Sequence, residues 1–163
     1  MKLLLKDLVF TLAVPGTVGV YIPLLLARGR APASGPVFLL ALAPLVTGGG
    51  IYAWCVWEFA VFGRGTPAPI DAPKKLVVRG LYRYTRNPIY VGGLTVLLGW
   101  TVMFRAMNLL IYAFCVAICF HLFVVFYEER RLRRQFGSEY DDYCAKVGRW
   151  LPARKPGNSK IFF

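Results

Sequence analysis

The sequence is short of acidic residues, histidine and cysteine. It has 8 Asp and Glu residues against 20 Lys and Arg residues, a formal net charge of +12, and only one histidine. The four cysteines, Cys55, Cys115, Cys119 and Cys144, lack the CxxC spacing of metal ligands, so we expect no metal site. Cys115 and Cys119 share a helix face, and we expect them to be small residues at helix contacts.

The positive charge alone would suit a protein that binds nucleic acid. No nucleic-acid-binding motif accompanies it, however, and most of the basic residues lie next to apolar segments. Basic residues in that position attract anionic lipid head groups by about 1 kcal/mol each. We therefore expect membrane lipids, and not nucleic acid, as partners.

Long apolar segments dominate the chain. Hydrophobic residues make up 57% of it, and the mean hydropathy is +0.52. Four segments approach the roughly 20 residues that cross a bilayer, and they run from about Leu8 to Leu26, Val37 to Phe59, Ile89 to Phe104 and Leu109 to Tyr127. The fold class predicted is an all-α membrane bundle of about four transmembrane helices with cytoplasmic interfacial segments.

The first apolar segment follows Lys2 and Lys6, as the core of a signal peptide would. It is too long for that and lacks a convincing small-residue cleavage site, so we expect a retained helix. The chain has room for one membrane domain, with two spans in residues 1–62 and a carboxy-terminal half in residues 63–155 that holds the other two spans.

The basic residues also predict the orientation of this domain. Seventeen of the 20 Lys and Arg residues lie in the amino-terminal segment, the linker from Gly63 to Arg86 and the carboxy-terminal tail. The other three, Arg28, Arg30 and Arg105, lie in the two remaining short loops. The positive-inside rule then places both termini and the linker in the cytoplasm.

A compact polar cluster begins the third apolar segment. Asn87 is a preferred helix cap and Pro88 suits the first helical position, so the cluster is a well-formed helix start. The same start presents free N–H groups and partial positive charge to an anion, with Arg86 beside it. Gly92 and Gly93 follow and permit close approach of a ligand or a helix.

Two adjacent carboxylates, Glu128 and Glu129, end the fourth apolar segment. Neighbouring residues on a helix point about 100° apart, so we expect one to face a site and the other to meet solvent or Arg130–Arg134. The alternative interpretation is a solvated charge run. Carboxylates next to an apolar helix are costly to desolvate without a cation, which favours a ligand ammonium or an arginine nearby.

Two more ionisable residues lie within apolar segments. His121 precedes Glu128 by seven residues on roughly the same helix face, and Glu58 lies near the end of the second segment. Each is either a packed, hydrogen-bonded residue or a functional one. In the tail, Phe136, Tyr140 and Tyr143 recur at helical spacing and predict a short surface helix packed on the site, with Arg149 and Trp150 closing it.

Taken in order, these motifs resemble a known family, the membrane methyltransferases of the isoprenylcysteine carboxyl methyltransferase and phospholipid methyltransferase group. The resemblance covers roughly Gly65 to Pro152. It rests on Gly-Leu-Tyr-Arg-Tyr-Thr-Arg-Asn-Pro-Ile-Tyr at 80–90, Glu-Glu-Arg-Arg-Leu at 128–132 and Phe-Gly-Ser-Glu-Tyr-Asp-Asp-Tyr at 136–143.

The resemblance implies S-adenosylmethionine as methyl donor, held by the carboxy-terminal half of the chain. The cofactor-binding residues that it implies are Lys75, Leu76, Val77, Tyr82, Asn87, Pro88, Ile89, Tyr90 and Glu128. The donor has an ammonium, a carboxylate and a sulfonium, which suit a carboxylate, N–H groups or arginine, and aromatic faces respectively. We assign catalytic roles to Arg86, Arg149 and Glu129.

Two departures from the family pattern concern the mechanism and the substrate. Asn87 stands where the family usually has histidine, and an amide cannot titrate near neutral pH. Val124 stands where prenylcysteine enzymes of the family have an arginine, so specificity for a prenylated cysteine is unsupported.

The predicted function is direct methyl transfer to a lipidic or apolar acceptor that enters from the bilayer, as in isoprenylcysteine carboxyl methyltransferases. The alternatives are N-methylation of a phospholipid amine on the same fold, and a non-catalytic four-helix protein that binds lipid.

Overall fold

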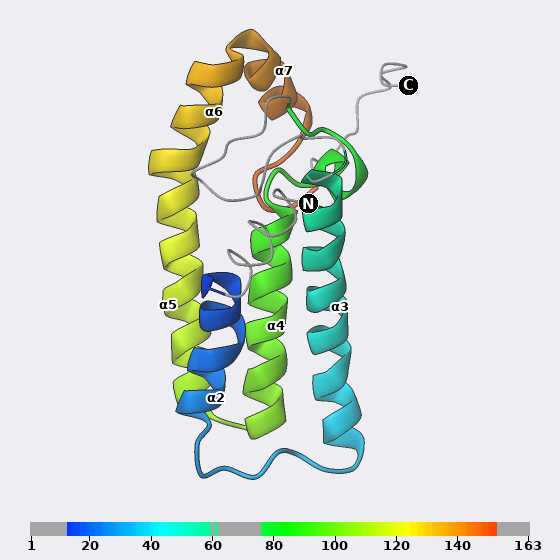
Figure 1. Ribbon diagram of the computed structural model, residues 1–163, viewed down its shortest axis with the longest axis vertical. Helices are drawn as coiled ribbons and strands as arrows, with labels where there is room; N and C mark the ends of the chain where they lie inside the picture. Colours follow the sequence, from blue (N-terminus) through cyan, green and yellow to red (C-terminus); the bar gives the residue numbers. More distant parts are fainter. Residues whose placement is uncertain (1–12, 60, 62–75, 153–163) are drawn as a thin grey trace.

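The computed structural model describes residues 13–59, 61 and 76–152, and in these residues the chain is helical (Figure 1). A π-helical stretch η1 (Thr17–Tyr21) leads into α2 (Ile22–Leu26), and the long helix α3 (Pro36–Glu58) follows. A short 3-10 turn η3 (Gly80–Arg83) precedes α4 (Pro88–Phe104) and α5 (Met107–Phe123). A π-helical turn η4 (Val124–Glu128) continues α5 into α6 (Glu129–Phe136), and α7 (Ser138–Lys146) completes the described part.

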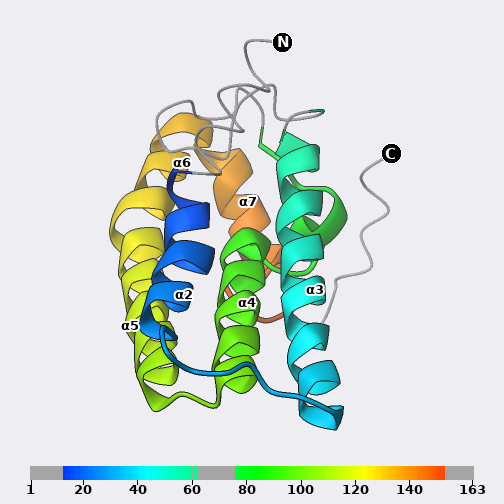
Figure 2. The ribbon, with the colours of Figure 1, turned by 60° about the horizontal axis from the view of Figure 1, so that its bottom comes forward.

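The helices form an antiparallel bundle in which α3 and α5 run in one direction and α2 and α4 in the other (Figures 1 and 2). Two helices, Pro36–Glu58 and Met107–Phe136, are long and apolar enough to cross a membrane, and Thr17–Leu26 and Pro88–Phe104 are shorter apolar helices. Only 11% and 17% of the most apolar stretches of the two long helices is buried in the protein. Their outward faces are therefore apolar, as lipid contact requires, and the predicted all-α membrane bundle is confirmed.

Glycines bring α3 and α4 into backbone contact. A Cβ atom on Gly48 would lie 2.6 Å from the carbonyl oxygen of Gly92, and one on Gly92 would lie 2.9 Å from the carbonyl oxygen of Gly48. Farther along, a Cβ atom on Gly99 would lie 3.0 Å from the backbone nitrogen of Leu45. Small residues give membrane helices this close packing, since apolar side chains gain nothing by leaving lipid.

Polar contacts hold the amino-terminal helix against α4 and α5. The indole nitrogen of Trp100 donates to the carbonyl of Gly19 at 2.8 Å, and the Tyr112 hydroxyl donates to the carbonyl of Val18 at 3.0 Å. Asn108 donates to the carbonyl of Leu26 at 2.9 Å. Val18 and Gly19 lie in the π-helical stretch η1 and Leu26 is the last residue of α2, and in a bilayer their carbonyls need such donors.

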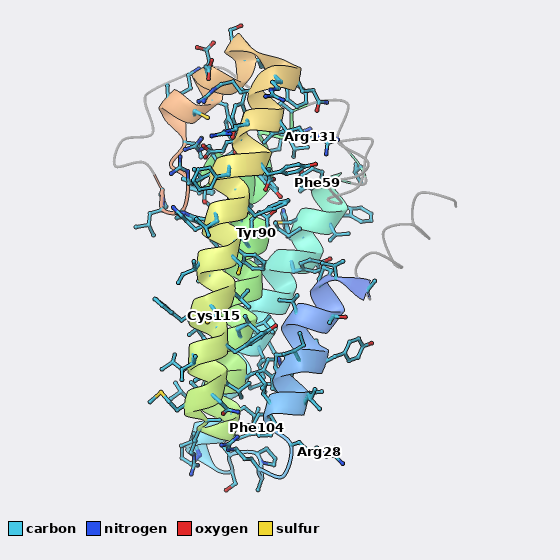
Figure 3. The ribbon with its side chains drawn as sticks, turned by 90° about the vertical axis from the view of Figure 1, so that its left-hand side faces the viewer. Arg28, Phe59, Tyr90, Phe104, Cys115 and Arg131 are labelled. Atoms are coloured by element: carbon cyan, nitrogen blue, oxygen red, sulfur yellow. The ribbon has the colours of Figure 1, made fainter. Side chains whose placement is uncertain are left out.

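The polar loops gather at the two ends of the bundle. Figure 3 shows Arg28 and Phe104 at one end, and Phe59 and Arg131 at the other. The second end also holds η3, α6 and α7 (Figure 1), so residues 76–86 and 138–152 meet there. The expectation that Cys115 and Cys119 lie at helix contacts is wrong, because both are exposed on the surface of the bundle, whereas Cys55 is buried.

Candidate functional site

The start of α4 is built differently from the sequence expectation. Pro88 occupies the first turn of α4, as predicted, and Asn87 stands at the cap position, but its side chain makes no capping hydrogen bond. The Asn87 amide instead donates to the carbonyl of Arg149 at 3.0 Å, and the Thr85 hydroxyl donates to the same oxygen at 3.0 Å. The first N–H groups of α4 are therefore left without a side-chain cap, as an anion site at a helix start requires.

The carboxy-terminal segment lies alongside the chain that enters α4. Thr85 and Gly148 form a parallel β-bridge, and the Arg86 N–H donates to the carbonyl of Gly148 at 3.0 Å. Helix α7 packs beside this bridge, with Tyr140 and Tyr143 buried and the Tyr143 hydroxyl donating to the carbonyl of Tyr82 at 2.7 Å. The structure has the predicted short helix at Tyr140 and Tyr143, whereas Phe136 is the last residue of α6.

Glu129 is buried and paired with two arginines from distant segments. Arg149 binds it through two hydrogen bonds, of 2.7 and 3.0 Å, and Arg86 Nη1 lies 3.2 Å from its Oε1 atom. The pairing raises the pKa of Arg149, so the guanidinium stays charged at any physiological pH. The structure thus brings together the three residues predicted to be catalytic, Arg86, Arg149 and Glu129.

Glu128 also points into the protein and makes a different contact. The hydroxyl of Tyr90 on α4 donates to Glu128 Oε2 at 2.7 Å. The expectation that one of the two carboxylates meets solvent or Arg130–Arg134 is therefore wrong. The two side chains do diverge, but each meets a protein partner. Glu128 meets Tyr90 of α4, and Glu129 meets Arg149 of the tail together with Arg86.

The π-helical turn η4 sets the direction of both carboxylates. The N–H of Glu129 bonds to the carbonyl of Val124, five residues earlier. Such a turn inserts an extra residue into the helical repeat, so the side chains that follow it are rotated relative to α5. Single π-turns within α-helices often occur at functional sites.

Aromatic rings surround the Tyr90 hydroxyl. Its ring lies 4.9 Å from that of Phe120 and 6.5 Å from that of Trp150, measured between centroids, and Figure 3 shows Tyr90 between the helices near the polar end. Trp150 stacks on His121 at 6.1 Å and donates from its indole nitrogen to His121 Nδ1 at 3.2 Å. His121 is therefore a hydrogen-bonded partner of the tail.

Tyr82 connects α3 with the carboxylate site. It is buried with Cys55 and Val77, and Ile89 packs against the same cluster. Burial raises the pKa of Tyr82 well above its ordinary value, and the nearby Cys55 and Glu128 raise it further, so the hydroxyl stays protonated.

Of the predicted cofactor-binding residues, Lys75 lies outside the described part of the chain. Tyr82 lies in η3, Asn87–Tyr90 lie at the start of α4, and Glu128 ends η4. Val77 packs in one cluster with Tyr82, and Leu76 packs against the tyrosines of α7. They were assigned from a resemblance, and their role in binding stays a prediction.

Several contacts at the site have no sequence signal. Phe120 reads as one more apolar residue of a membrane helix, and Gly148 as a loop residue. Arg86 Nη1 donates to Cys144 Sγ at 2.7 Å, and nothing in the sequence around Cys144 predicts this contact. Only Thr85 could have been found from the sequence, because it directly precedes the polar cluster that begins at Arg86.

In a comparison with protein families, the phospholipid methyltransferase model matches residues 37–139. The matched region begins in α3 and includes η3, α4, α5, Glu128, Glu129 and the first residues of α7. Searches of curated proteins and of solved structures found no significant similarity.

Proposed function

The chain belongs to the phospholipid methyltransferase family, and we propose that it transfers a methyl group from S-adenosylmethionine to a lipidic acceptor at the membrane surface. The observation that carries this proposal is the position of Glu128, a carboxylate held at the polar start of α4 by a tyrosine hydroxyl.

The two carboxylates differ in what they offer a ligand. Glu129 is neutralised by Arg86 and Arg149, whereas Glu128 accepts a hydrogen bond from the uncharged hydroxyl of Tyr90. A carboxylate bonded to a neutral hydroxyl suits a ligand ammonium, such as the one at the amino-acid end of S-adenosylmethionine.

The other groups of the donor find matching chemistry in the same place. The Nε atom of Arg86 is buried without a hydrogen-bond partner among the described residues, and it suits a ligand carboxylate together with the uncapped start of α4. The rings of Tyr90, Phe120 and Trp150 suit a sulfonium. When bound, S-adenosylmethionine supplies an electrophilic methyl carbon, and these residues orient it and exclude water.

The surroundings of the site suit an acceptor that comes from the bilayer. The outward faces of α3 and α5 are apolar along their length, and large side chains such as Trp54, Phe114 and Phe126 are exposed on them. The basic end of the bundle faces the cytoplasm in this proposal, because Lys and Arg residues concentrate there. Soluble donor and lipid acceptor then approach from opposite sides.

The acceptor class has two candidates. The sequence favoured an isoprenylcysteine carboxyl methyltransferase-like enzyme, but Val124, at the position of that enzyme's arginine, is buried with 1% exposure. The matched family model describes phospholipid methyltransferases, which favours an amine head group. In either case the catalytic assignment of Arg86, Arg149 and Glu129 stays a prediction.

Calorimetric titration of the purified protein with S-adenosylmethionine tests the proposal. We expect saturable binding, and lipid analysis of membranes with and without the protein should show species that differ by one methyl mass. A protein that binds no S-adenosylmethionine would be the non-catalytic lipid-binding bundle, and both enzyme proposals would be lost.

A further inference from the structure

Glu58, the last residue of α3, is a buried carboxylate outside the site described above. It is 8% exposed, and its Oε2 atom is buried without a hydrogen-bond partner in the part of the chain that the structure describes. Among the described residues it forms no ion pair, whereas Glu129 has two arginines and Glu128 has a tyrosine. Glu58 is thus the buried carboxylate that the protein leaves least satisfied.

An ionised oxygen in that position is costly. A buried polar atom without a partner costs about 1 to 3 kcal/mol, and a charged one costs more. Ionisable residues within membrane helices that carry such a cost mark ligand sites more often than packing sites. The matching ligand group is a cation, because a carboxylate only accepts hydrogen bonds.

The surroundings of Glu58 are those of a small aromatic cation site. Gly80 has a φ of +54°, and a Cβ atom there would lie 3.0 Å from Glu58 Oε1 and 2.9 Å from the indole nitrogen of Trp54. The backbone of η3 therefore lies directly against the carboxylate and the indole, which only glycine permits. Phe59 and Tyr82 pack edge to face beside them at 5.6 Å.

This position also has the depth of a lipid head group. Trp54 and Trp57, on the same stretch of α3, are 57% and 67% exposed. Tryptophan on the outside of a membrane helix favours the interface between head groups and hydrocarbon. Phe59, the residue after Glu58, lies at the polar end of the bundle (Figure 3), and the buried ring of Tyr82 packs against Phe59 and Cys55.

We propose that Glu58 is a specificity residue that binds the ammonium of an amine lipid head group beside Trp54 and Gly80. The inference rests on the proposed function, since it places the acceptor on the α3 side of Tyr82 and the donor on the Glu128 side. A primary ammonium is small, donates hydrogen bonds and is attracted to an aromatic face, so it suits this carboxylate and indole.

The test compares an amine lipid with a derivative whose head-group nitrogen carries no charge. Native mass spectrometry of the full chain in detergent measures retention of phosphatidylethanolamine and of its N-acetyl derivative, which lacks the ammonium. We expect the wild-type protein to prefer phosphatidylethanolamine by about tenfold or more, the effect of one charge-assisted hydrogen bond. Glu58→Gln keeps the shape of the side chain and removes the charge, so the preference should disappear.

Two further variants separate binding from folding. Glu139→Gln removes the same charge from the exposed surface of α7 and should leave the preference unchanged. Glu58→Asp keeps the charge but withdraws it by one methylene, so the preference should fall while the unfolding temperature stays near that of the wild type. This variant decides the question if Glu58→Gln does not fold.

Wild-type protein without a preference for the amine lipid would overturn the inference, and so would a preference that survives in Glu58→Gln or is unchanged in Glu58→Asp. The proposed function fails separately. A protein that prefers the amine lipid through Glu58 but binds no S-adenosylmethionine would keep this inference and lose the methyltransferase.

Discussion

The Tyr90 hydroxyl and Glu128 Oε2 lie 2.7 Å apart although 38 residues separate them in the chain. This hydrogen bond joins the start of α4 to the end of η4, so the polar ends of two antiparallel helices face each other at one end of the bundle. It also holds the Glu128 carboxylate in one direction before any ligand arrives, which reduces the entropy lost on binding.

The first prediction concerns the charge of Glu128. Glu128→Gln should weaken binding of S-adenosylmethionine by about 1.5 to 3 kcal/mol, because it removes a charge-assisted pair with the ligand ammonium. Calorimetric titration measures the change, with Glu139→Gln on exposed α7 as the matched control. An unchanged dissociation constant would exclude Glu128 from the site.

The second prediction is that loss of the Glu129 charge lowers the stability of the protein. Glu129→Gln leaves Arg86 and Arg149 without their carboxylate, and the Arg86 and Glu129 side chains are only 12% and 10% exposed. We expect a loss of about 2 to 4 kcal/mol in the free energy of unfolding, reduced from the value for a fully buried pair because Arg149 is 35% exposed. Denaturant unfolding in detergent measures the loss.

The double variant Glu129→Gln, Arg149→Gln provides the control for this ion pair. It removes both charges, so it should be less destabilised than the sum of the two single variants. Simple additivity of the two losses would show that the residues do not interact in solution.

A pair of neighbouring glycines tests the contact between α3 and α4. Gly92→Ala would place a methyl group 2.9 Å from the carbonyl oxygen of Gly48, whereas Gly93→Ala would meet only a ring carbon of Phe120 at 3.8 Å. We expect Gly92→Ala to destabilise the protein by about 1 to 3 kcal/mol and Gly93→Ala to be neutral or slightly stabilising. Thermal unfolding compares them, and equal effects would contradict the backbone contact.

The sequence predicted those parts of the fold that depend on local composition. Apolar length identified α3 and α5, Pro88 marked the start of α4, and the spacing of Tyr140 and Tyr143 predicted α7. Each of these signals lies within the element that it predicts, and bilayer thickness restricts the alternatives.

The contacts of the site were harder to predict because they join distant segments. The partner of Asn87 is a backbone carbonyl 62 residues away, so the cap preference of asparagine was overridden by a tertiary contact that no local pattern reports. Similarly, an ideal helix rotates Glu128 and Glu129 onto separate faces, but the fold supplies a partner on each face, and the π-turn η4 has no recognisable sequence pattern.

The last prediction concerns the carbonyl of Arg149, which accepts from both the Asn87 amide and the Thr85 hydroxyl at 3.0 Å. Asn87→Ala or Thr85→Val leaves one donor in place, so each should cost about 1 kcal/mol. The double variant leaves this oxygen with neither side-chain donor, and its loss should exceed the sum of the two single losses by about 0.5 to 3 kcal/mol. Hydrogen exchange of Gly148–Trp150 should accelerate in parallel, because these donors fix the tail beside α4. If the double variant is no worse than the sum, the two donors act independently of each other.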